Sequence, residues 1–242
     1  MLKIEKFVTM SPAQYEIIIE GMRNPKNSWD RSDSYTTHIC DEETMETADF
    51  AWFMGDNDHK LAESLADGGP VHAKYRRMMI VYLTINAPFY WWKEFDTYKV
   101  GTVCNSCSTM HKIHSKEFTM DDFSVEHVCS NAFDTSGIID VFGDGDGKEM
   151  MAPIRITEMT IEMLNQMREQ YLCTNDKKYW WQMIQLLPTN YNQKRTIMLN
   201  YEVLANIYKW RKNHKLDEWH TFCNWIEELP YSELITGIKD VD

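Results

Sequence analysis

Residues 78–85, MMIVYLTI, constrain the fold more than any other stretch of the chain. They are rich in β-branched and aromatic residues, and a short, continuous apolar run of this kind is typical of a buried strand. LKIEKFVTM at the N-terminus and KRTIML just before Asn200 also predict strands. These few strands alternate with longer helical segments, which indicates a mixed α/β or α+β domain.

The expected helices are recognised from their caps and apolar spacing. Ser11 and Pro12 supply a cap and a first-turn proline for AQYEIIIEGMR. Asn200 can cap a helix near the C-terminus. The apolar face of that helix is formed by Val203, Leu204, Ile207 and Tyr208. Further helices are expected over residues 55–67, 87–98, 156–172, 179–187 and 217–229.

Three more local predictions can be compared with the structure. Met159, Met163, Met167 and Tyr171 recur every four residues, which indicates a helix face that packs into the core. Residues 24–38 are polar and turn-rich and predict a long loop. FGDGDGKE at residues 142–149 predicts a turn, and it lacks the spaced acidic residues that a calcium loop requires.

Composition and charge exclude several classes of protein. With 242 residues, of which 43% are hydrophobic, the chain can bury a substantial core, and we expect one domain over residues 1–242. A net charge of −12 disfavours binding to a nucleic-acid polymer or an anionic membrane, although a local positive pocket can still take a small anion. No apolar run is long enough for a membrane span or a signal peptide. We therefore expect a cytoplasmic protein whose six cysteines are reduced.

Residues 102–112, TVCNSCSTMHK, could hold a metal, carry out thiol chemistry or bind a ligand. Cys104, Cys107, His111 and His114 are suitable zinc ligands, but structural zinc sites usually separate their ligand pairs by about a dozen residues. A redox C-x-x-C pair normally follows a strand at a helix N-terminus, whereas here a helix is expected before it. Neither alternative is favoured, and no metal is predicted.

The third interpretation takes the polar side chains of this segment as ligands for a phosphate or a pyrimidine ring. Hydroxyl and amide groups come from Thr102, Asn105, Ser106, Ser108 and Thr109. Lys99 adds a positive charge. Upstream, HAKYRR at residues 72–77 concentrates three cations and a histidine, although a solvated basic turn would look the same.

The order of these pieces resembles the flavin-dependent thymidylate synthases. A basic H-x-K-x-x-R segment, a strand, Ala-Pro and a predicted helix precede T-x-x-N-x-x-S-x-x-H. The family signature has the form R-H-R-x-x-S-x-N-x-x-S-x-R-Y. With one extra residue near Cys104, Thr97, Tyr98 and Lys99 stand in place of Arg-His-Arg, and Met110 stands in place of the later arginine.

The second half of the chain carries the same resemblance through its spacing. Asn200 lies 12 residues after Pro188, Asn206 lies 6 residues after Asn200, and Arg211 lies 5 residues after Asn206. The family has the same spacing from its Leu-Pro to its N-L-R, then to a second Asn, and then to a terminal L-R. Glu202 stands where the family has a flavin-contacting arginine, which reverses the charge at that position.

The resemblance implies a fold and a reaction. The fold is α+β, with a central sheet flanked by helices in a single domain. The reaction transfers a one-carbon unit from methylenetetrahydrofolate to C5 of the pyrimidine nucleotide dUMP, with FAD as cofactor and NADPH as reductant. The family is homotetrameric, with active sites between subunits, so the resemblance also implies a homo-oligomer.

The resemblance also implies roles for individual residues. Arg211 is the expected catalytic cation beside the uracil ring. The expected flavin-binding residues are His72, Lys74, Thr97, Tyr98, Lys99, Ser106, Asn200, Glu202 and Asn206. The expected nucleotide-binding residues are Glu94, Asn105, Ser106, Ser108, Thr109, Met110 and Arg211. Because the Arg-His-Arg is missing, a non-catalytic pyrimidine-nucleotide-binding protein and a zinc-stabilised interaction protein remain alternatives.

Overall fold

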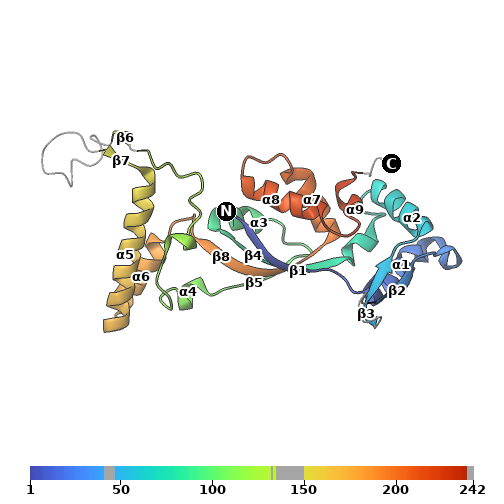
Figure 1. Ribbon diagram of the computed structural model, residues 1–242, viewed down its shortest axis with the longest axis horizontal. Coiled ribbons are helices and arrows are strands. Elements are labelled where there is room, and N and C mark those ends of the chain that lie inside the picture. The colour runs from blue at the N-terminus through green and yellow to red at the C-terminus, as the bar shows by residue number, and fades with distance from the viewer. Residues whose placement is uncertain (41–46, 132, 135–149, 239–242) are drawn as a thin grey trace, which may run out of the picture. The chain divides into compact units, whose positions relative to one another are not determined.

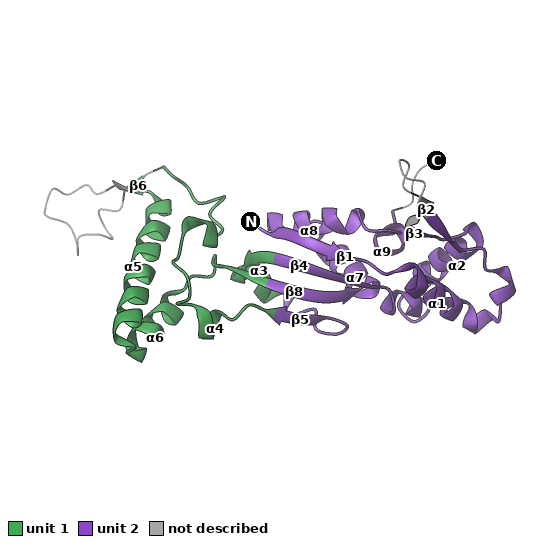
Figure 2. Cartoon of the chain, turned by 60° about the horizontal axis from the view of Figure 1, so that its bottom comes forward, with its two compact units in different colours: residues 1, 86–94, 106–194 green, residues 2–85, 95–105, 195–242 purple. Residues whose placement is uncertain are grey.

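The computed structural model describes residues 1–40, 47–131, 133–134 and 150–238, and the chain divides into two compact units. Unit 1 contains residues 1, 86–94 and 106–194, and unit 2 contains residues 2–85, 95–105 and 195–242 (Figure 2). The predicted turn at residues 142–149 lies outside the described residues. The α+β class is confirmed, whereas the extent of a single domain over residues 1–242 stays a prediction.

A four-stranded sheet has the strand order β1-β4-β8-β5 (Figure 1). Its strands are β1 (Lys3–Val8), β4 (Ile80–Pro88), β8 (Asn192–Asn200) and β5 (Val103–Ser106). Val81, Leu83 and Ile85 of β4 are almost completely buried, which confirms the buried strand predicted from MMIVYLTI. The strands predicted at the N-terminus and before Asn200 are also confirmed, as β1 and β8.

Strand β5 replaces part of what the sequence indicated as a ligand loop. All four of its residues are exposed, and it lies at one edge of the sheet. Its sequence, VCNS, has no apolar alternation because neither face of this short edge strand is covered. Hydrogen bonding to the neighbouring strand, and not side-chain burial, therefore determines its conformation.

Unit 2 contains the other predicted elements of the N- and C-terminal segments. Its helices are α1 (Pro12–Arg23), α2 (Asp56–Asp67), α7 (Tyr201–Arg211), α8 (Asp217–Glu227) and α9 (Glu233–Thr236). Its 3-10 helices are η1 (Asn24–Lys26), η2 (Trp29–Arg31) and η3 (Lys74–Arg77). Strand β2 (Tyr35–Cys40) pairs antiparallel with β3 (Thr47–Phe53). The predicted loop at residues 24–38 was therefore wrong in part, since η1, η2 and the start of β2 occupy it.

The core of unit 2 forms where helices α7 and α8 bury their apolar faces, and the face of α7 is the predicted one. Val203, Leu204, Ile207 and Tyr208 of α7 are all buried. On α8, Trp219, Phe222, Cys223 and Ile226 are buried as well. Phe222 packs edge-on against Phe95, and Trp225 packs edge-on against Phe7 of β1. Helix α8 thus packs against the edge strand β1.

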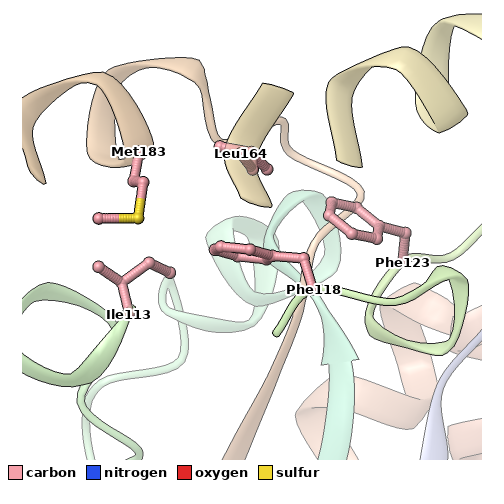
Figure 3. Close-up of a cluster of buried hydrophobic side chains, with 5 residues drawn as sticks. All are labelled: Ile113, Phe118, Phe123, Leu164 and Met183. Atoms are coloured by element: carbon pink, nitrogen blue, oxygen red, sulfur yellow. The ribbon is translucent and has the colours of Figure 1, made fainter. Parts of the chain in front are cut away.

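Unit 1 has its own apolar cluster, formed by Ile113, Phe118, Phe123, Leu164 and Met183. Figure 3 shows these side chains pointing toward one another, with Leu164 from α5 (Pro153–Thr174) and Met183 from α6 (Lys177–Leu186). The remaining elements of this unit are α4 (Thr109–Lys112), η4 (Met120–Asp122), β6 (Phe133–Asp134) and β7 (Met150–Met151). Helix α3 (Phe89–Phe95) contributes residues to both units.

Two helix predictions in unit 1 were wrong in detail. Met159 and Met163 are 51% and 45% exposed, because the buried stripe of α5 passes through Leu164 instead; Met167 and Tyr171 pack against the cluster as predicted. The helix predicted at residues 87–98 is the shorter α3. Its expected first turn completes strand β4, since proline is compatible with the end of a strand as well as with the start of a helix.

Candidate functional site

A cavity of about 860 Å³ in unit 2 brings together several residues that the sequence predicted to bind a flavin. Its walls come from α2, η3, α7, α9 and the segment at residues 97–100. The predicted residues in the lining are Thr97, Tyr98, Lys99, Glu202 and Asn206. Two segments about a hundred residues apart in sequence therefore meet at one cavity, whose volume is typical of a small-molecule site.

Helix α7 provides one wall of this cavity because residues three and four positions apart share a helix face. Glu202, Asn206 and Lys209 recur at that spacing along the lining, and Asn213 follows just after the helix ends. The helix begins at Asn200, whose Oδ1 accepts a hydrogen bond from the backbone N–H of Val203 at 3.0 Å. The predicted capping role of Asn200 is confirmed, and it fixes where the lining face of α7 begins.

Gly101 allows the segment at residues 97–100 to lie against the start of α7. Its φ of +79° is in the region that favours glycine. A Cβ at this position would lie 2.7 Å from Nδ2 of Asn200 and 3.1 Å from Cγ2 of Val203. A larger residue could not make this close approach, so Gly101 helps to position Tyr98 and Lys99 in the cavity wall.

A buried ion pair forms another part of the wall. Arg76 donates from Nη2 and Nε to Oε2 of Glu202 at 2.6 and 2.9 Å, and from Nη1 to the carbonyl oxygen of Leu234 at 3.0 Å. Arg76 is only 7% exposed. The negative charge of Glu202, which stands where the resemblance expected an arginine, is therefore neutralised by a guanidinium from η3. In the sequence, Arg76 is one of the three cations of the basic segment at residues 72–77, with no indication of its pairing with Glu202.

Other charged side chains of both signs surround the cavity. Lys99, Lys209 and Lys212 supply positive charge. A hydrogen bond that the ammonium group of Lys212 donates to the hydroxyl oxygen of Tyr208 raises the pKa of Lys212, so this side chain stays charged at neutral pH. The acidic side chains in the lining are Glu63, Asp67, Glu202 and Glu233. Nε2 of His59 lies 2.7 Å from Oε1 of Glu233 and thereby links α2 to α9.

Arg211 supports the cavity wall through a neighbour and does not line the cavity itself. Its Nε donates a hydrogen bond to Oη of Tyr98 at 2.9 Å. Its guanidinium carbon lies 4.7 Å from the centroid of the Trp219 ring and 5.6 Å from that of Tyr98. The structure thus gives Arg211 a positioning contact with Tyr98, and its predicted contact with a uracil ring stays a prediction.

The remaining predicted residues lie outside this lining in the described part of the chain. His72 and Lys74 are exposed on the basic segment, and Asn105 is exposed on β5. In unit 1, Ser106 ends β5 and Glu94 is half-buried in α3.

Three further predicted residues of unit 1 have local contacts. Oγ of Ser108 accepts a hydrogen bond from the N–H of His111 at 3.2 Å and caps α4. Oγ1 of Thr109 accepts from Nε2 of Gln193 at 2.9 Å. Met110 accepts through its carbonyl oxygen from Nε1 of Trp180 at 2.9 Å, and its side chain is exposed. Ser108, Thr109 and Met110 therefore help to hold their own segment in place.

Cys104 and Cys107 are exposed and carry free thiols. Over the described ranges, no three His, Cys, Asp or Glu side chains gather as possible metal ligands. The same part of the chain contains no helix that is long and apolar enough to cross a membrane. The cavity in unit 2 is the candidate functional site because it brings together predicted residues from two segments that are distant in sequence.

The fold is similar to that of known enzymes over nearly the whole chain. One is the flavin-dependent thymidylate synthase of Helicobacter pylori, solved in complex with FAD and dUMP. The two structures superpose with a TM-score of 0.56 and a sequence identity of 13%, and the match covers 97% of this chain and 96% of that one. Another is the UMP/dUMP methylase PolB of Streptomyces cacaoi, bound to 5-Br dUMP, with a TM-score of 0.57, 10% identity and coverage of 98% and 95%. No protein-family model and no curated protein sequence matches this chain. The fold expected from the resemblance is confirmed.

Proposed function

We propose that this chain is a flavoprotein that binds FAD in the cavity of unit 2 and methylates a pyrimidine nucleotide such as dUMP at C5. The observation that carries this proposal is the meeting of Thr97, Tyr98, Lys99, Glu202 and Asn206 at that cavity. The similarity of the fold to enzymes that bind dUMP or its analogue supports it. Methylenetetrahydrofolate as the one-carbon donor, NADPH as the reductant, a cytoplasmic location and a homotetramer complete the proposal.

The lining offers suitable groups for a flavin. The amide of Asn206 can donate to and accept from a polar ring edge, and the ammonium groups of Lys99 and Lys209 can pair with phosphates. Tyr98 presents an aromatic ring whose hydroxyl is fixed by Arg211. A bound flavin supplies the hydride chemistry of such a reaction, while these side chains bind and orient it.

Arg211 is the proposed catalytic cation. Its guanidinium remains charged at any working pH, and it can stabilise negative charge that develops on a pyrimidine carbonyl. Stacking on Trp219 and the hydrogen bond to Tyr98 restrict its rotamers, so little further ordering is needed on ligand binding. For unit 1, Glu94, Ser106, Ser108, Thr109 and Met110 stay predicted nucleotide-binding residues.

One observation favours a second function, that of a non-catalytic nucleotide-binding protein. Thr97, Tyr98 and Lys99 replace two guanidinium groups and an imidazole that could bind phosphate, and each charge-assisted hydrogen bond of that kind contributes about 1.5–3 kcal/mol. A protein with this function would bind dUMP and raise its melting temperature by mass action without retaining a flavin.

A flavin titration distinguishes the two functions. The protein is titrated with FAD while flavin fluorescence is followed, with and without dUMP. The proposal predicts saturable quenching that weakens in Asn206→Ala and Lys99→Ala, whereas Lys215→Ala, an exposed change outside the cavity lining, binds like the wild type. Stabilisation by dUMP without flavin binding at either condition would contradict the enzyme and support the non-catalytic protein.

A further inference from the structure

A second cavity, of about 600 Å³, lies in unit 2 where α1 ends and α2 begins, and it shares no lining residue with the candidate functional site. Its walls come from the last residue of α1, the 3-10 helices η1 and η2, and α2. The lining consists of Arg23, Lys26, Asn27, Ser28, Asp30, Arg31, Asn57 and Leu61. Three of these residues are cationic and one is acidic.

Arg23 is the buried member of this lining, with 3% of its surface exposed. Its Nε donates to Oδ1 of Asp58 at 2.5 Å. Its Nη1 lies 3.2 Å from the carbonyl oxygen and 3.3 Å from Oγ of Ser28. Its Nη2 is buried and has no hydrogen-bond partner within the part of the chain that the structure describes. Buried donors in folded proteins are almost always paired with protein, water or an ion, so this nitrogen points to a missing acceptor.

Oδ2 of Asp58 cannot serve as that acceptor without giving up other bonds. Its Oδ2 already accepts hydrogen bonds from Oγ of Ser32 at 2.8 Å, Oγ of Ser34 at 2.7 Å, and the backbone N–H groups of Asp33 and Ser34 at 3.1 Å each. Burial disfavours its charge, but the hydrogen bonds from Ser34, Ser32 and Arg23 outweigh burial and lower the pKa of Asp58. Oδ2 of this carboxylate is thus fully engaged, and Oδ1 accepts from Nε of Arg23.

The rest of the lining is chemically suited to an anion. Lys26 and Arg31 are exposed at the cavity, where they outnumber the single carboxylate of Asp30. Asn27 and Asn57 add side-chain amide donors. This local excess of positive charge contrasts with the net charge of −12 of the whole chain, which otherwise repels anions. Several N–H donors with positive charge around one space form the usual surroundings of a phosphate.

We propose that this second cavity binds the phosphate group of a small phosphate ester, with Nη2 of Arg23 as the buried donor and Lys26 and Arg31 as the exposed cations. The cavity is larger than one phosphate ion, which leaves room for an organic part beyond the phosphate. Binding here depends neither on a flavin nor on Arg211, and the proposal is independent of the function assigned to the first cavity.

Isothermal titration calorimetry of the full chain tests this site, with glycerol 3-phosphate and inorganic phosphate as probes. The wild type is expected to bind glycerol 3-phosphate saturably and more tightly than inorganic phosphate. Arg23→Lys keeps a cation beside Asp58 but removes the second guanidinium nitrogen, and it is expected to weaken binding at least about tenfold. Lys26→Ala combined with Arg31→Ala is expected to have an effect of the same size.

Two control variants and a melting curve make the result decisive. Lys215→Ala removes an exposed charge elsewhere, and Lys209→Ala removes a lysine of the first cavity; both are expected to bind glycerol 3-phosphate like the wild type. Lys26 and Arg31 are exposed, so their double variant keeps the test valid even if Arg23→Lys lowers the melting temperature. The proposal is overturned if no saturable binding occurs, if inorganic phosphate binds as tightly as the ester, or if the double variant binds like the wild type.

Discussion

Removal of the Glu202 carboxylate is expected to destabilise unit 2 strongly. In Glu202→Ala, Arg76 loses both of its hydrogen bonds to Oε2 and keeps the one to the carbonyl of Leu234. The side chains of this pair are only 9% and 19% exposed, so the guanidinium is left charged and nearly buried. Breaking such a pair costs about 3–5 kcal/mol, and the partial exposure of Glu202 places the expected loss at about 3 kcal/mol.

Thermal unfolding followed by circular dichroism measures this loss. For a chain of this size each kcal/mol lowers the melting temperature by about 2–4 °C, which gives an expected decrease of about 6–12 °C. The ion pair between Arg195 and Asp96 is the matched control, because Asp96 is 51% exposed and such pairs contribute at most about 1 kcal/mol. A decrease for Glu202→Ala no larger than that for Asp96→Ala would refute the assignment of a buried, stabilising pair to the cavity wall.

The remaining predictions concern the supports of the two cavities. Gly101→Ala is expected to lower the free energy of unfolding by about 1–3 kcal/mol and to weaken FAD binding in a fluorescence titration. Gly69 has a φ of +83° with open space around it, so Gly69→Ala adds only backbone strain and is expected to leave FAD binding unchanged. Arg211→Lys loses the planar contact with Tyr98 and is expected to weaken FAD binding about tenfold in the same titration; an unchanged affinity would contradict its positioning role. The pKa of Asp58 is lowered in the folded state, so its contribution to the free energy of unfolding is present above the ordinary pKa of 3.8 and is lost as the pH falls through the folded pKa. Urea unfolding should therefore show that Asp58→Asn is less stable than the wild type at pH 7 and loses less stability on acidification. Parallel pH profiles of the two proteins would contradict this.

The sequence predicted elements whose signals are local. The apolar run of β4 and the caps at Ser11 and Asn200 depend on residues next to one another in the chain, and they are confirmed. The edge strand β5 carries no such signal, because its side chains are exposed and its partner is distant in sequence. On α5, spacing alone could not distinguish a stripe through Met163 from one through Leu164, since both fit a helical period.

The candidate site was predictable only where its residues belong to a recognisable sequence motif. Tyr98, Lys99, Glu202 and Asn206 were found through motif spacing, which does not require a three-dimensional contact. Arg76 was missed as a cavity residue because its partner Glu202 lies 126 positions away, and only the folded chain brings the two together. Side-chain pairing across such distances leaves no pattern in one sequence.

Binding of FAD in the cavity of unit 2 can be tested with a cavity-filling variant. Ala205 lines the cavity on α7, so Ala205→Trp places an indole in the space that the flavin would occupy. The measurement is the visible flavin absorbance of wild type and variant after incubation with FAD and passage through a desalting column. The account predicts flavin retained by the wild type and lost in Ala205→Trp at an unchanged melting temperature. Equal retention by both proteins, or none by the wild type even with dUMP present, would contradict it.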